Sequence, residues 1–196
     1  MTTPELTTER LLLRQWRDDD VLPLARINTD PQVMEFFPAP LTAEQTAEMV
    51  GRQQALLEAG LPALFATEIR ETGEFIGFIG LSVPRFQAPF TPCVEIGWRL
   101  ARAHWGQGYA TEGAHVVLDH AFAELGLEEV VSFTSIANLR SRALMVRLGM
   151  HHDPSEDFNH PALEADDPLL RHALYRYPRP SRAVTSDTDA EPDEQD

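Results

Sequence analysis

Short runs of hydrophobic residues, bounded by polar and turn-forming residues, predict a β-sheet along much of the chain. The runs are rich in Val, Ile, Leu and Phe, and several alternate apolar with polar positions, as strands do. Because the turn 71–73 joins two of these runs, we expect the pair to form a hairpin. Gly97 lies inside another run and is expected to mark a β-bulge. The predicted strands are 9–16, 64–70, 74–83, 93–100, 129–136 and 172–177.

Helical periodicity occupies stretches between these strands. In the longest such stretch after residue 100, apolar residues recur every three or four positions, and a glycine follows the last of them. Thr42 and Gln45 form a capping box, and Asn138 is placed as an N-cap. The predicted helices are 21–28, 43–59, 107–125 and 138–149. This order of elements predicts a single α/β (α+β) domain with mixed strand pairing.

Composition places the chain among ordinary cytoplasmic proteins. Of its 196 residues 43% are hydrophobic and 24% are charged, as in soluble globular domains. The single cysteine, Cys93, cannot form an internal disulfide, and residues 1–10 lack the features of a signal peptide. No apolar run approaches the roughly 20 residues of a membrane span. We therefore expect a cytoplasmic protein that does not contact a membrane.

The charge is unevenly distributed. The formal net charge is −15, and residues 183–196 hold six acids and no base, so we expect a disordered acidic tail after a domain spanning 6–178. The remaining excess of acids disfavours nucleic acid as a partner and suits a cationic one, although most acidic surfaces only serve solubility. Two windows, 96–111 and 130–152, contain no acid and together hold five arginines. They indicate a local anion site.

The stretch HWGQGYATEG, residues 104–113, is a glycine-rich turn between a predicted strand and a predicted helix. It lacks the third glycine of a dinucleotide-binding GxGxxG motif, and its surroundings contain no P-loop. Its small residues, Gly106, Gly108 and Ala110, would expose backbone N–H groups at a helix N-terminus, where a pyrophosphate binds well. From the residues alone, a helix entry that merely needs a tight turn is an equally good interpretation.

The segment VEIGWRLARAHWGQGYATEGAHVVLDHAF (94–122) resembles motif A of the GNAT N-acetyltransferases, and NLRSRALMVRLGM (138–150) resembles the segment that follows it in that family. With TERLLLRQW and TGEFIGFIGL, the resemblance covers about residues 6–177. The opening TERLLLR is similar to the RimJ/RimL-like branch. The resemblance implies a GNAT fold: a central, mixed, mostly antiparallel twisted sheet of about seven strands flanked by helices. It also implies acetyl-CoA as cosubstrate and no metal.

The resemblance also assigns binding residues. The family loop reads Q/R-x-x-G-x-G/A, and Ala103 stands where Gln or Arg is usual, so Arg102 is a candidate for the missing charge. Asn138 matches an asparagine that faces the pantetheine arm, which is expected to pair with the backbone at Arg99 and Leu100. The residues expected at the pyrophosphate are Trp105, Gly106, Gln107, Gly108, Tyr109, Ala110 and Thr111.

Two residues are candidates for the chemistry. Glu95 lies between apolar neighbours in the strand that resembles the catalytic strand, so partial desolvation would raise its pKa toward that of a useful general base. Alternatively it recognises the amine directly, caps a strand ladder or pairs with an arginine. The developing oxyanion would meet N–H groups at the expected Gly97–Trp98 bulge. The family often protonates the leaving thiolate with a tyrosine, but Met145 occupies that position here. Ser141 stands where the RimJ/RimL-like branch carries a serine, so the resemblance makes it the candidate for contacting the thiol, unless it only satisfies helix donors.

These residues predict an N-acetyltransferase that moves the acetyl group of acetyl-CoA to a primary amine by direct transfer in a ternary complex. The acceptor is a protein N-terminal α-amine or a small cationic amine, and residues 36–40 and 84–92 are expected to frame its entrance. Because Met145 cannot donate a proton, a non-catalytic acyl-CoA sensor is the alternative. The polar segment 151–160, with three histidines, is expected to form a loop or pocket rim rather than a metal site. A homodimer stays open.

Overall fold

The structure, a computed structural model, describes residues 4–180, and the hydrophobic runs fold as predicted. All six predicted strands are present. The structure adds three two-residue strands, β1, β7 and β8, which are too short to produce a sequence pattern. The strands are β1 (Leu6–Thr7), β2 (Leu11–Arg14), β3 (Leu64–Ile69), β4 (Phe75–Ser82), β5 (Glu95–Leu100), β6 (Glu129–Ser135), β7 (His151–His152), β8 (Phe158–Asn159) and β9 (Arg171–Pro178).

The strands form one nine-stranded sheet in the order β1-β2-β3-β4-β5-β6-β9-β7, with β8 also paired to β9. Every pairing is antiparallel except that of β5 with β6, which is parallel. The prediction of a mixed, mostly antiparallel sheet is therefore confirmed. The predicted tail at residues 183–196 lies outside the described part of the chain.

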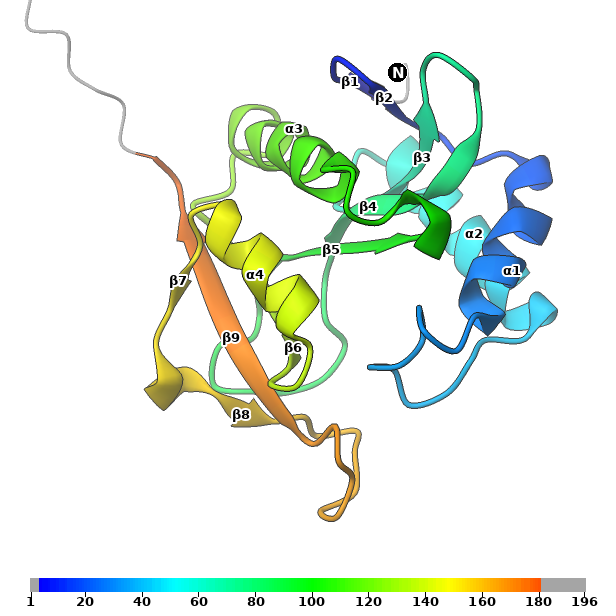
Figure 1. The fold of residues 1–196 in the computed structure, drawn as a ribbon. Coiled ribbons are helices and arrows are strands. Elements are labelled where there is room, and N and C mark those ends of the chain that lie inside the picture. Colours follow the sequence, from blue (N-terminus) through cyan, green and yellow to red (C-terminus); the bar gives the residue numbers. More distant parts are fainter. Residues whose placement is uncertain (1–3, 181–196) are drawn as a thin grey trace, which may run out of the picture.

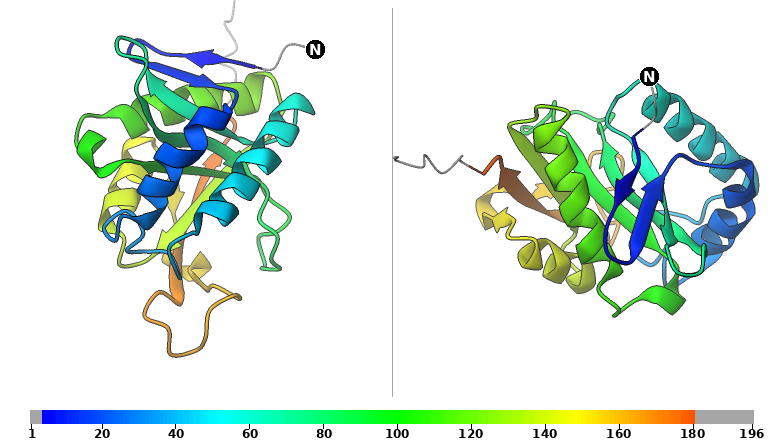
Figure 2. Two further views of the ribbon diagram at one scale, coloured as in Figure 1. Left: turned by 90° about the vertical axis from the view of Figure 1, so that its right-hand side faces the viewer. Right: turned by 90° about the horizontal axis from the view of Figure 1, so that it is seen from above.

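Four helices cover the sheet: α1 (Val21–Thr29), α2 (Ala43–Glu58), α3 (Tyr109–Ala123) and α4 (Leu139–Arg147). Figure 1 shows α3 and α4 together on one face, and the views in Figure 2 place α1 and α2 on the other. The two predicted helix caps are present. The Thr42 hydroxyl accepts from the Gln45 N–H in a capping box, and Asn138 is the N-cap of α4. All four predicted helices are confirmed.

The small residues of α3 bring this helix close to the sheet. Ala114, Val117 and Ala121 are fully buried against the central strands. At Gly113 the helix lies so near β4 that an added Cβ would be 2.4 Å from the Ile79 Cδ1 atom. The helix therefore packs directly on the face of the sheet that carries Ile79.

The predicted bulge at Gly97 is wrong. The register of β4 and β5 runs without a break from Gly77 opposite Leu100 to Ser82 opposite Glu95. The irregularity in this part of the sheet lies instead between Thr67 and Glu68 in β3. At position 97 the glycine faces Gly80 across the strand pair, so it belongs to an ordinary stretch of ladder.

Candidate active site

A cavity of about 1030 Å³ opens beside the point where β5 and β6 separate. The two strands share one registered pair, Glu95 with Val131, and the Ser132 hydroxyl donates to the Ile96 carbonyl at 2.9 Å. No ladder pair joins them beyond that point in the described chain. The backbone of β5 from Gly97 onward therefore has a free edge toward β6, on which an extended ligand can add like a strand.

Most of the predicted site residues come together at this cavity. They arrive from three elements: β5, the glycine-rich loop that leads into α3, and the first turn of α4. Arg102 and Gln107 do not line it. The Arg102 Nε lies 3.5 Å from Asp30 Oδ2, and the Gln107 amide donates to the Ala103 carbonyl. Those that line the cavity are Glu95, Arg99, Leu100, Trp105, Gly106, Gly108, Tyr109, Ala110, Thr111, Asn138 and Ser141.

The glycine-rich loop presents an uncapped helix N-terminus to the cavity. Gly108 is the N-cap of α3, and its φ of 84° is in the left-handed region that favours glycine. No side chain caps this end, so the first N–H groups of the helix keep their hydrogen-bonding capacity and the positive end of the helix dipole. The Trp105 indole holds the loop to β5 by donating to the Leu100 carbonyl at 2.9 Å.

A network from the start of the chain holds this loop, and the sequence analysis did not find it. Arg10 donates to the Gln107 carbonyl at 2.9 Å, pairs with the Glu112 carboxylate and lies 4.7 Å from the centre of the Tyr109 ring. The Thr8 hydroxyl donates to the same carboxylate. Partial burial raises the pKa of Glu112, but the hydrogen bonds from Thr8 and Arg10 outweigh it and lower the pKa overall. The only sequence signal was the TERLLLR opening itself.

Glu95 lies at the start of β5, half-buried, with its carboxylate accepting a hydrogen bond from the Ser82 hydroxyl at 3.1 Å. Burial raises the pKa of Glu95 to about 7, and the Ser82 hydrogen bond opposes this only in part. The pairing with an arginine that the sequence left open is absent from residues 4–180. Glu95 is thus a cavity-facing carboxyl that titrates near neutral pH.

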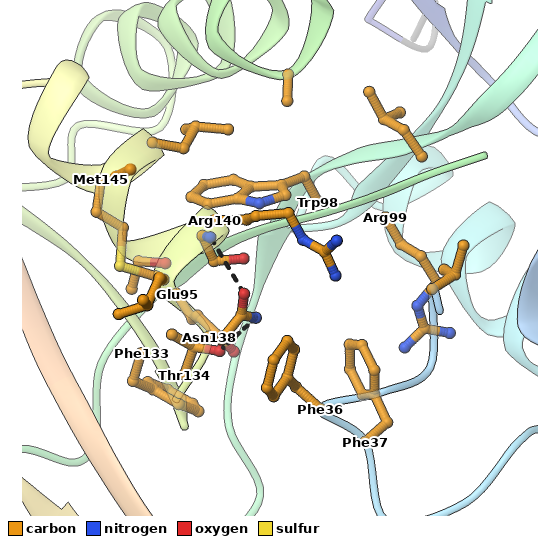
Figure 3. Close-up of a pocket in the computed structure, with 18 of the residues that line it drawn as sticks. Phe36, Phe37, Glu95, Trp98, Arg99, Phe133, Thr134, Asn138, Arg140 and Met145 are labelled. Atoms are coloured by element: carbon orange, nitrogen blue, oxygen red, sulfur yellow. Dashed lines mark hydrogen bonds between the residues drawn. The ribbon is translucent and has the colours of Figure 1, made fainter. Parts of the chain in front are cut away.

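The start of α4 forms the opposite wall. Asn138 uses its Oδ1 to accept from the Ser141 N–H at 3.2 Å and its Nδ2 to donate to the Thr134 hydroxyl at 3.0 Å. The Ser141 side chain lines the cavity, and among the described residues its hydroxyl has no hydrogen-bond partner. Met145 also lines the cavity and is almost fully buried. Figure 3 shows Asn138, Met145 and Glu95 together on one side.

The two faces of β5 have different surroundings. Trp98 lies opposite Ile79, which packs against Gly113 of α3, so Trp98 is on the α3 face. Arg99 lies opposite Phe78 and donates to the Asn28 side chain of α1 at 2.7 Å, so it is on the α1 face. Since side chains alternate along a strand, Glu95 shares the α1 face with Arg99.

The loops expected to frame the entrance do contribute to the cavity. Phe36, Phe37 and Pro38 come from one of them, and Pro84, Arg85 and Phe86 from the other. An aromatic cluster continues this wall. The sequence analysis largely missed it, because its members come from four separate segments. It contains Phe86, Phe90, Phe133, Phe158, His160 and His172, with the His160 and His172 ring centres 5.0 Å apart.

Residues 4–180 contain neither a metal-binding cluster nor a membrane-spanning helix. No group of three or more His, Cys, Asp and Glu side chains is arranged to hold a metal ion. None of the helices in this range combines the length and the apolar character that crossing a membrane requires.

Comparison with protein families gives a match to the acetyltransferase (GNAT) domain over residues 10–151. The chain is 34% identical over 149 residues to the uncharacterized protein YkkB of Bacillus subtilis, covering 76% of this chain and 86% of that protein. It is 35% identical over 155 residues to FsC-acetyl coenzyme A-N(2)-transacetylase of Aspergillus fumigatus, covering 76% and 66%.

Solved structures show the same fold. The acetyltransferase from Agrobacterium tumefaciens superposes with a TM-score of 0.71 at 30% identity, covering 90% of this chain and 95% of that one. RimL, a ribosomal L7/L12 alpha-N-protein acetyltransferase in complex with coenzyme A, has a TM-score of 0.72 at 15% identity, covering 89% and 98%. Both structures share the GNAT fold with this chain, and at 15% identity the match to RimL shows the fold alone.

Proposed function

Since this chain belongs to the GNAT acetyltransferase family and is an acetyl-CoA-dependent N-acetyltransferase, we propose that it transfers the acetyl group directly to a primary amine bound on the α1 face of β5. The observation that carries the proposal is the Glu95 carboxyl, which faces the cavity and has a pKa of about 7. An alkylamine is mostly protonated at neutral pH, so it needs a base of this kind before it can attack.

The residues at the cavity fit acetyl-CoA. The uncapped N-terminus of α3, with Gly106 and Gly108 in the left-handed region, would hold a pyrophosphate. The free edge of β5 at Arg99 and the cap residue Asn138 would hold the pantetheine arm. When bound, acetyl-CoA supplies the acetyl group as a thioester. Arg102 and Gln107 would contribute at most through their backbone, since both side chains turn away.

Glu95 is proposed to take the proton from the acceptor ammonium, directly or through a water molecule. The Ser82 hydroxyl orients its carboxylate. Because the bulge at Gly97 does not exist, donors for the developing negative charge on the acetyl oxygen would be N–H groups on the free edge of β5.

Ser141 is proposed to contact the leaving sulfur, because it lines the cavity and its hydroxyl has no hydrogen-bond partner within residues 4–180. Met145 has no proton to give, and a thiolate is already a good leaving group. The names of relatives, which include N-acetyltransferases, favour turnover over the sensor that Met145 left open.

The acceptor amine is proposed to be a protein N-terminal α-amine or a small-molecule amine. The first is supported by the similarity to RimL, an alpha-N-protein acetyltransferase, and the second by the similarity to the Aspergillus relative, an N(2)-transacetylase.

The test is release of CoA from acetyl-CoA in the presence of a panel of α-amino peptides and small amines between about pH 6 and 9. We expect turnover that rises through a pKa near 7. Glu95→Gln should lower kcat by roughly 100-fold or more and remove that rise. The exposed, surface-paired Glu129→Gln is the matched control and should behave as wild type. Full activity of Glu95→Gln would exclude Glu95 as the base. Binding of acetyl-CoA without turnover on any amine would support the alternative function, a non-catalytic acyl-CoA sensor.

A further inference from the structure

Arg99 is a half-buried cation whose donors are only partly used by the fold. Its Nη1 donates to the Asn28 Oδ1 at 2.7 Å, but its Nε is buried without a hydrogen-bond partner, and no carboxylate of residues 4–180 pairs with its guanidinium. Burial lowers the pKa of Arg99 to about 10, with no acidic neighbour to offset it. A buried guanidinium normally has several donors occupied, because leaving them empty is costly.

The surroundings hold this side chain in one place. Its Cζ lies 4.1 Å from the centre of the Phe37 ring and 5.3 Å from that of Phe78. Asn28 is itself fixed, because its amide donates to the Thr46 hydroxyl of α2 at 3.0 Å. These contacts hold the guanidinium in place. Its Nη2 makes no hydrogen bond within residues 4–180, so it keeps donors for a carboxylate in the cavity that Arg99 lines.

The anion that Arg99 would bind is not the pyrophosphate. The glycine-rich loop leads into α3 on one face of the sheet, whereas Arg99 points to α1 on the other. Figure 3 shows Arg99 beside Phe37, away from Asn138 and Met145. The three other arginines that line the cavity, Arg85, Arg140 and Arg147, are exposed, and Arg140 already pairs with Glu35 at 3.0 Å.

The spacing along β5 limits what can reach both charged residues. Glu95 and Arg99 are four residues apart on one face of an extended strand, so their Cα atoms are about 13 Å apart. Figure 3 shows their side chains on opposite sides of the pocket. A free α-amino acid is too short to place its amine at Glu95 and its carboxylate at Arg99. An extended peptide can, if an acidic side chain follows its free N-terminus by about two residues.

We infer that the acceptor of this acetyltransferase is an amine that also carries a carboxylate, separated from the amine by on the order of 10 Å, and that Arg99 binds this carboxylate. The inference rests on the proposed function and names its substrate class. It replaces the cationic acceptor suggested by the net charge of −15, because the cavity itself is lined by four arginines and one glutamate. An acidic peptide N-terminus is the source to which we commit.

The experiment compares two peptides with a free α-amine that differ only in Glu or Gln at the third residue, with a long ω-amino carboxylic acid as a small-molecule arm. We expect wild type to acetylate the Glu peptide with a kcat/KM roughly 10-fold higher. Arg99→Met should abolish this preference, so that the ratio of kcat/KM for the Glu peptide to that for the Gln peptide falls to about 1, whatever the overall rate of the variant. Arg52→Met, an exposed arginine of α2, is the matched control. Arg99→Lys, which keeps the charge without the planar fork, should keep part of the preference.

Several results would overturn the inference. The first is that wild type acetylates both peptides at equal rates. The second is that the preference for Glu survives Arg99→Met. The third is that the main effect of Arg99→Met is a higher KM for acetyl-CoA, equal with either peptide. If wild type prefers only the ω-amino acid, the acceptor is still an amine that carries a carboxylate, but it is not a peptide N-terminus. If wild type acetylates the Gln peptide without preferring Glu, only this inference fails. If wild type acetylates no amine at all, the proposed function fails.

Discussion

Two arginines of the sheet, the buried Arg14 and the half-buried Arg99, have opposite surroundings. Arg14 in β2 donates to Asp20 at 2.7 Å and to Glu68 at 2.5 Å, and both carboxylates are buried with it. Arg99 in β5 has one neutral partner, Asn28, and a buried Nε without any. Burial alone lowers the pKa of Arg14, but its two carboxylates outweigh this and raise it, whereas burial alone decides the lowered pKa of Arg99.

The difference separates structure from function. The Arg14 cluster is complete within the chain: it ties β2 and β3 to the start of α1 and has nothing left to bind. The site around Glu95 and Arg99 is incomplete, because each charged group there faces a cavity rather than a counter-ion. Keeping such groups desolvated lowers the free energy of unfolding, and a bound ligand of opposite charge offsets that cost.

The largest expected effect is on the Arg14 cluster. Arg14→Met would leave Asp20 and Glu68 buried without their cation, so we expect the free energy of unfolding to fall by about 3–5 kcal/mol. Urea denaturation measures it. The control is Arg17→Met. Arg17 is exposed and its Nη1 lies 3.4 Å from an oxygen of the same Glu68, so its loss should lower the free energy of unfolding by less than about 1 kcal/mol. A loss of similar size in both variants would contradict the assignment of Arg14 as the central cation.

The second prediction concerns pH and Glu95. Its pKa rises from about 4.5 in the unfolded chain to about 7 in the fold, so its favourable contribution is complete below pH 4.5 and is lost as the pH rises through 7. Glu95→Gln, which carries no charge, should gain at most about 3 kcal/mol of stability relative to wild type between pH 4.5 and 8. Denaturation at several pH values measures the difference. A constant difference would show that Glu95 is not desolvated.

A third, smaller effect tests the loop network. Arg10→Met removes the donor to the Gln107 carbonyl and the partner of Glu112, so the loop before α3 should lose its fixed position. We expect the KM for acetyl-CoA to rise up to about 10-fold with kcat changed less than that, as measured by steady-state kinetics. Arg70→Met, which removes a neighbouring arginine bonded to the Thr8 carbonyl, is the control. A fall in kcat alone would assign Arg10 to the chemistry instead.

The smallest effect on stability should come from Arg99 itself. Because Arg99 has no counter-ion, Arg99→Met leaves no carboxylate unpaired. It does remove the donor to the buried Asn28 Oδ1, so we expect the free energy of unfolding to fall by about 1–2 kcal/mol, less than for Arg14→Met. Thermal or urea denaturation beside Arg14→Met gives the direct comparison. A loss as large as that of Arg14→Met would mean that Arg99 also serves the fold.

The sequence by itself determined the elements, the fold class and the position of the glycine-rich loop. Apolar periodicity, capping residues and glycine punctuation are local properties, so they predict helices and strands from neighbouring positions. The residues that match the family motifs, such as Gly106, Gly108 and Asn138, likewise lie within short continuous segments. Glu95 could be singled out for the same reason.

Only the tertiary structure decided which of two similar arginines is satisfied. Arg14 donates to Glu68, 54 residues away along the chain, and Arg99 donates to Asn28, 71 residues away. Neither partner can therefore be identified from the local sequence. The Thr8 and Arg10 contacts with Glu112, about a hundred residues away, have the same origin. Burial, and therefore the pKa of Glu95 and the free donors of Arg99, arises when distant segments pack around a residue, and no pattern of near neighbours contains that information.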